Sequence, residues 1–155
     1  MSGIAIEVLI ILVLIGVNGL LAMAEISVVS ARKARLQQLV EQGEEHAIGA
    51  LQLANDPGDF LSTIQIGITL VGILAGAFGG ATIAEQLASW IKELPILGPY
   101  NDLIALVIVV AIITYLTLIF GELVPKRLGL NNPERIAMRV SRPMQTFTHL
   151  TLPVV

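Results

Sequence analysis

Glu122 is the residue of this sequence best placed to do chemistry. It follows the long uncharged run from Leu103 to Phe120, and ionisable groups at membrane depth are rare and usually mark ion paths or proton relays. Pro125 has no backbone N–H and clashes with the carbonyl of Gly121, so oxygens beside Glu122 are expected to turn away from the helix. A carboxylate next to such oxygens suits a hard cation. The alternative is an interfacial ion pair between Glu122 and Lys126, one helical turn further on.

A second group of polar residues ends the first apolar segment and interrupts the second. Asn18 and Glu25 are about two helical turns apart, so both can face one side of a helix. Ser27 adds a hydroxyl close by, while Gln65 and Thr69 are polar positions of the second segment. Amide, carboxylate and hydroxyl oxygens suit magnesium rather than zinc or copper. The alternatives are a hydrogen bond from Asn18 across helices and a hydrated Glu25 at the interface.

Signatures of an enzyme are thin. The chain has no cysteine, no histidine pair at metal spacing, no glycine-rich phosphate loop and no Gly-x-Ser-x-Gly elbow. The net charge of −3 indicates neither a nucleic-acid binder nor an acidic tail. We therefore expect a protein that is not an enzyme and has no nucleic-acid partner.

The composition places these residues in a membrane protein. Hydrophobic residues make up 55% of the 155 positions and charged residues 14%, below the roughly 25% that is usual in soluble domains. Mean hydropathy is +0.82, and three uncharged stretches approach or exceed the length of about 20 apolar residues that crosses a bilayer. They predict an all-α integral membrane domain with spans at about 4–25, 60–83 and 103–124. No Lys or Arg precedes the first span, which favours a retained helix over a cleaved signal peptide.

Charged, amphipathic segments follow the first and third spans. One covers about 30–55 and is expected to break at Gly43, and the other covers about 133–142, with Pro133 at its first helical position. Eight of the nine Lys and Arg residues follow these two spans, so the positive-inside rule makes that side cytoplasmic. We expect a multi-pass protein of the cell inner (plasma) membrane with its N-terminus outside. The chain stops in an apolar segment, which suggests a fragment of a longer protein.

The second span is unusually rich in glycine. Each glycine costs roughly 1 kcal/mol of helix propensity relative to alanine, and the span contains Gly67, Gly72, Gly76, Gly79 and Gly80. One interpretation is close helix packing, because Gly72 and Gly76 have the small-xxx-small spacing, and this predicts a symmetric dimer through the span. The other is a broken helix whose freed carbonyls line a polar cavity.

Three ordered motifs carry a resemblance to a known family. They are Asn18–Leu36, Asn55–Leu70 and Gly121–Lys126. Together they resemble the transmembrane domain of the CNNM/CorC family, also called DUF21 and often labelled hemolysin-like. The resemblance implies one domain over 1–155, a homodimer in membrane lipid with three membrane helices and a cytoplasmic helical belt. It also implies partner CBS domains and a small C-terminal domain in the full-length protein, which are absent from this chain.

The resemblance also implies a function and a site. Family members are implicated in the export of magnesium, sometimes cobalt, so Mg²⁺ is expected as transported ion rather than as catalytic cofactor. The implied ligands are Glu122, Gly121, Ser27 and Thr69, with a possible additional polar site of Asn18, Glu25 and Gln65. Where magnesium-binding members have hydroxyl residues and an Asn, this chain reads Ala22-Met23-Ala24 and Gly67-Ile68-Thr69. The alternatives are an exporter of organic polycations or a membrane scaffold that anchors cytoplasmic regulatory domains.

Overall fold

The computed structural model describes residues 2–79, 83–91 and 100–151, and the regular elements of this part are helices. This confirms the predicted all-α class. In chain order they are α1 (Ser2–Ser30), α2 (Lys33–Glu41), α3 (Glu45–Asn55), α4 (Gly58–Phe78), α5 (Ala84–Ile91), α6 (Asn101–Leu118), the π-helical segment η3 (Ile119–Leu123), α7 (Val124–Asn131) and α8 (Pro133–Thr151).

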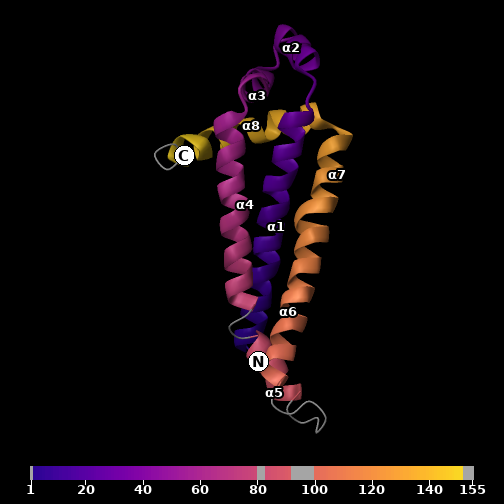
Figure 1. The fold of residues 1–155 in the computed structure, drawn as a ribbon. Coiled ribbons are helices and arrows are strands. Elements are labelled where there is room, and N and C mark those ends of the chain that lie inside the picture. The colour runs from indigo at the N-terminus through magenta and orange to yellow at the C-terminus, as the bar shows by residue number, and fades with distance from the viewer. Residues whose placement is uncertain (1, 80–82, 92–99, 152–155) are drawn as a thin grey trace.

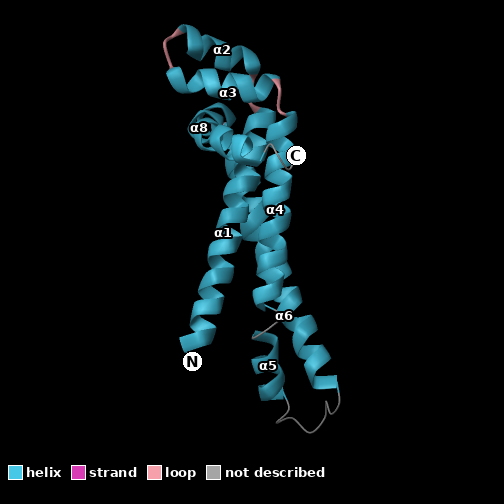
Figure 2. Ribbon diagram, turned by 90° about the vertical axis from the view of Figure 1, so that its left-hand side faces the viewer, coloured by secondary structure: helices cyan, strands magenta, loops and turns pink. Residues whose placement is uncertain are grey.

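Three long rods form the body of the molecule. Helices α1 and α4 are two of them, and α6, η3 and α7 run on from one another as the third, with α1 between the other two (Figure 1). Stretches long and apolar enough to cross a membrane cover Ile4–Ser30, Gly58–Phe78 and Asp102–Asn131. The N-terminal end of α1 and helix α5 lie at one end, and α2, α3 and α8 lie at the other (Figures 1 and 2). The two amphipathic segments therefore share one end, as the sequence predicts.

The helix boundaries differ from the predicted ones in ways that have local causes. The first span continues to Ser30 because no charge follows Glu25 until Arg32. The Ser27 hydroxyl also donates a hydrogen bond to the Met23 carbonyl of the same helix, at 2.6 Å. The third span continues to the end of α7, since a proline in the first turn of α7 loses no α-helical bond within that helix. The last helix runs past Arg142 to Thr151, with Pro143 inside it.

The glycines of α4 do not break it, because the helix is continuous from Gly58 to Phe78. The predicted end of this span, at 80–83, lies mostly outside the described residues. Two described residues beyond α4, Gly79 and Ile83, are π-helical, and a longer π-helical segment lies in the third span, at η3. Of the two interpretations, an interrupted second span is therefore wrong for 58–78.

Close packing through glycine occurs between α1 and the third rod. A Cβ added at Gly19 would lie 2.9 Å from Pro125 Cγ, and one added at Gly129 would lie 2.5 Å from Ile26 Cγ2. These distances are too short for a side chain, so the two glycines let the backbones approach closely where lipid gives little hydrophobic drive. This contact brings the end of the first span against η3 and α7.

The predicted break at Gly43 is confirmed and forms a tight helical hairpin. Gly43 has φ of +87° and is the one described residue with a positive φ. Its N–H donates to the Val40 carbonyl at 3.0 Å, and the Glu44 N–H donates to the Leu39 carbonyl at 3.1 Å. This is a Schellman ending, which favours glycine at the left-handed position. It folds α3 back along α2 (Figure 2).

A shared apolar core fixes the hairpin to the membrane helices. Leu36 of α2, Phe60 and Ile64 of α4, and Ala137 of α8 are almost fully buried in one cluster with residues of α1 and α3. Each buried aliphatic or aromatic side chain contributes about 1.5–3 kcal/mol relative to exposure. Helices α2, α3 and α8 therefore form one packed unit on the ends of α1 and α4.

Two ion pairs close this unit from outside. Glu134, at the start of α8, accepts hydrogen bonds from Arg32 Nε at 3.0 Å and from the Arg32 backbone N–H at 3.3 Å. Arg142 NH2 lies 3.5 Å from Glu45 Oε2 of α3. Burial raises the pKa of the Glu134 carboxyl, but the hydrogen bonds from Arg32 outweigh it, so its pKa lies below the usual 4.5.

Glu134→Gln is expected to destabilise the domain at neutral pH by about 1 kcal/mol, because one partner, Arg32, is mostly exposed. The folded-state pKa is lowered, so the pair stabilises above about pH 4.5 and its contribution fades as the pH falls through the lowered pKa. Thermal unfolding in detergent at pH 7 and at pH 4 measures the difference. The control is Glu41→Gln, a change at an exposed position of α2. The ion-pair interpretation would be contradicted if Glu134→Gln lost the same stability at both pH values, or if Glu41→Gln lost as much.

Candidate cation site

The backbone around Glu122 is π-helical because α-helical bonding fails there. The Val124 N–H donates to the carbonyl of Ile119, five residues back, and Pro125 has no N–H to give to the carbonyl of Gly121. That carbonyl instead accepts a hydrogen bond from Asn18 Nδ2 at 3.0 Å. Pro125 and Gly121 thus act as their sequence predicts, and Asn18 bonds across helices as one of its two interpretations requires.

Three charged groups gather one turn beyond this contact, and we call them the carboxylate cluster: Glu25, Glu122 and Lys126. Lys126 Nζ lies 2.7 Å from Glu122 Oε1 and 3.7 Å from Glu25 Oε2 on α1. Their side chains are 25%, 45% and 33% exposed in chain order, so the described residues do not enclose the cluster. With both carboxylates ionised, the cluster carries one negative charge in excess.

A cavity of about 300 Å³ leads away from Glu122 between α4 and α6. Its walls are mainly apolar, with two hydroxyls, and comprise Gly72, Ala75, Gly76, Val110, Ile113, Thr114, Thr117, Leu118 and Glu122. A Cβ added at Gly72 or Gly76 would meet nothing within 4 Å, so these glycines widen the space. The cavity can take a chain with apolar and polar parts, with the Glu122 carboxylate at one end.

The predicted ligands divide into two groups. Asn18, Gly121, Glu122 and Glu25 are brought to one place by the contact between α1 and the third rod. Ser27 is buried elsewhere, with its hydroxyl 2.6 Å from the Met23 carbonyl and 3.4 Å from the carbonyl of Gly129. Gly129 is about two helical turns beyond Glu122 along the third rod.

Thr69 and Gln65 lie on an exposed face of α4. The Thr69 hydroxyl donates to the Gln65 carbonyl at 2.8 Å, and neither side chain is among those that line the cavity. In the part of the chain that the structure describes, no three His, Cys, Asp or Glu side chains gather as a metal site. The ligand set of Glu122, Gly121, Ser27 and Thr69 therefore stays a prediction.

Two features of the site were not predicted from sequence. Thr114 and Thr117 line the cavity, and the signal for them was a pair of hydroxyls one turn apart in a run of Ile, Val and Leu. Asn18 Oδ1 is buried and has no hydrogen-bond partner among the described residues, although its amide nitrogen is bonded. Buried polar atoms are nearly always bonded, so this oxygen is open to a donor or a cation.

Comparisons with known proteins agree with this architecture. The UPF0053 protein sll0260 of Synechocystis sp. is 48% identical over 154 residues, which cover 99% of this chain and 34% of that protein. The polyamine export proteins of Escherichia coli strain K12 and Haemophilus influenzae are 30% and 31% identical, each over 96% of this chain. The chain spans about a third of the length of these relatives. The family described as cyclin M transmembrane N-terminal domain matches residues 9–155, so the chain belongs to the CNNM family.

Proposed function

We propose that this chain is the membrane domain of a cation exporter and that its cargo is an organic polycation of the polyamine class. The observation that carries the proposal is the carboxylate cluster, whose Glu122 also lines the cavity. Two carboxylates from different helices lie around a primary ammonium, that of Lys126. A polyamine carries the same group at its ends, so Glu25 and Glu122 offer its ammonium groups the same charge-assisted hydrogen bonds.

The cavity supports the same cargo. A polyamine alternates ammonium groups with short methylene chains, which need apolar walls of the kind that α4 and α6 provide. Thr114 and Thr117 offer hydroxyl oxygens to an ammonium group further along the chain. The names of the relatives in Escherichia coli and Haemophilus influenzae lend independent support to a polyamine as cargo.

Magnesium is the second candidate, and Asn18 is the observation that favours it. The unbonded Oδ1 of Asn18, the carbonyl of Gly121 and the carboxylate of Glu122 are oxygens of the type that Mg²⁺ prefers. Mg²⁺ requires near-octahedral ligation and loses water reluctantly. Ser27 and Thr69 would have to move to complete such a shell. A polyamine needs no such cage, so we favour it over magnesium or cobalt.

The cargo can be tested in cells that express the full-length protein. Cells are loaded with labelled spermidine or with Mg²⁺, and the loss of each is followed against cells without the protein. We expect faster loss of spermidine and unchanged Mg²⁺. Loss of Mg²⁺ alone would move the assignment to the second candidate, and no loss of either would leave a scaffold that anchors the CBS domains.

We also propose that the domain works as a homodimer in the inner membrane, in contact through α4. Gly72 and Gly76 are exposed and line the cavity, so a second copy packed on this face of α4 would cover the open side of the cavity and leave its interior to the cargo. Gly72→Leu and Gly76→Leu are expected to weaken crosslinking of the protein in membranes. Gly16→Leu, at an equally open glycine of α1, is the control. Unchanged association in both α4 variants would contradict this interface.

A further inference from the structure

Lys126 occupies the position that a cargo cation would need. Its ammonium lies 2.7 Å from Glu122 Oε1 and 3.7 Å from Glu25 Oε2, and these are the carboxylates to which the proposed function assigns the cargo. A second ammonium beside Lys126 would face its like charge, because both would share the same two carboxylates. Replacement of one ammonium by another keeps the charge of the cluster unchanged. A cargo ammonium that takes this position between both carboxylates therefore requires Lys126 to leave.

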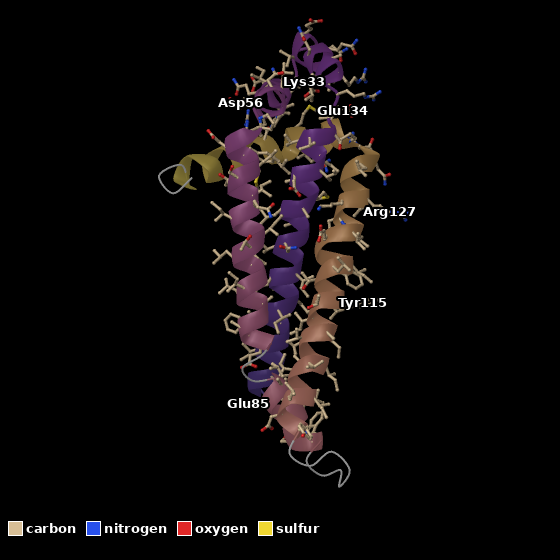
Figure 3. All side chains as sticks on the ribbon, in the orientation of Figure 1. Lys33, Asp56, Glu85, Tyr115, Arg127 and Glu134 are labelled. Atoms are coloured by element: carbon tan, nitrogen blue, oxygen red, sulfur yellow. The ribbon has the colours of Figure 1, made fainter. Side chains whose placement is uncertain are left out.

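The side chain of Lys126 is able to leave without a change of the backbone. It is 33% exposed, and its ammonium is carried on a flexible four-carbon stem. Arg127, the next residue, projects from the outer side of α7 into the surroundings of the bundle (Figure 3). Lys126 lies five residues before the end of the third span at Asn131, and α8 begins directly after that end. The long side chain of Lys126 can therefore extend its released ammonium toward the polar boundary of the membrane.

We propose that Lys126 is a resident competitor for the cation site. It neutralises part of the cluster when no cargo is present, and cargo binds by displacing it. Lys126 therefore sets the cargo concentration at which the site fills, rather than contributing a ligand to the cargo. This inference rests on the proposed function, because it takes the carboxylate cluster as the cargo site.

Binding to the purified chain tests the competition directly. Lys126→Met keeps the length and apolar stem of the side chain and removes the ammonium. Spermidine is expected to bind this variant about tenfold more tightly than the wild type, since two ion pairs no longer have to be broken. Arg127→Met is the matched control, with the same change of charge one residue away, and should leave affinity within about twofold. Equal or weaker binding to Lys126→Met would overturn the proposal.

A second measurement needs no variant. The rate of amine labelling at Lys126, taken as a ratio to Lys33 in the same sample, is expected to rise about threefold when spermidine saturates the wild-type chain, because a free ammonium is more accessible than a paired one. Lys33 is an exposed residue of α2, remote from the cluster (Figure 3). A ratio that falls or does not change would overturn displacement even if Lys126→Met fails to fold. If spermidine binds as expected but is not exported from cells, the proposed function fails and the competition stands.

Discussion

Glu122→Gln is expected to abolish export of the cargo while the domain still folds. Glutamine keeps the shape of the side chain and removes the charge that attracts a cation to the mouth of the cavity. The remaining Glu25 and Lys126 then carry no net negative charge. We expect cargo affinity to fall by about tenfold or more, equivalent to about 1.4 kcal/mol or more, with export falling at least in proportion.

Two other variants make this result interpretable. Glu85→Gln removes an exposed carboxylate of α5, at the opposite end of the molecule, and should export normally (Figure 3). Lys126→Gln should have a much smaller effect on export than Glu122→Gln. If Glu122→Gln exports normally and Lys126→Gln destabilises the domain, Glu122 is only half of an interfacial ion pair. The cation site would then have to be sought around Glu25 and Asn18.

Gly129→Ala is the substitution expected to cost most stability. The new Cβ would lie 2.5 Å from Ile26 Cγ2, 2.9 Å from Ser27 Oγ and 3.1 Å from the Met23 carbonyl, and backbone of α1 cannot yield as a flexible side chain can. Overpacking of this kind costs about 1–3 kcal/mol. Because the same contact holds Glu25 near Lys126, we also expect export to decrease.

The matched control is Gly16→Ala, at a glycine of α1 whose Cβ would meet nothing within 4 Å. Alanine is the better helix former by roughly 1 kcal/mol, so this variant should be as stable as the wild type or more stable. Thermal unfolding of both variants in the same detergent makes the comparison. Equal midpoints for Gly129→Ala and Gly16→Ala would show that α1 and α7 do not depend on the glycine contact.

The parts of the site that depend on local chemistry could be predicted from sequence. Pro125 lacks an N–H whatever the tertiary structure, so a perturbed backbone at Gly121 follows from the sequence alone. The spacing of Glu122 and Lys126 likewise permits their ion pair in any helix. The spans and the hairpin at Gly43 follow in the same way from the length of apolar runs and from turn chemistry.

The remaining features depend on how the helices approach and rotate. Glu25 lies near Lys126 where Gly19 and Gly129 let α1 approach the third rod closely, and this contact was not predicted from the sequence, which indicated glycine packing only in the second span. Ser27 and Thr69 have suitable oxygens, but each hydroxyl donates to the carbonyl four residues back in its own helix, and neither residue lines the cavity. A helical sequence gives the faces of each rod without saying which faces meet.

The central claim is that Glu25 and Glu122 bind the cargo cation. The most direct test is an experimental structure of the full-length protein with spermidine bound. We predict density for one ammonium group between these two carboxylates, the rest of the chain along Gly72 and Gly76, and the Lys126 ammonium moved away from Glu122. An intact Lys126–Glu122 pair with spermidine bound elsewhere would contradict the account.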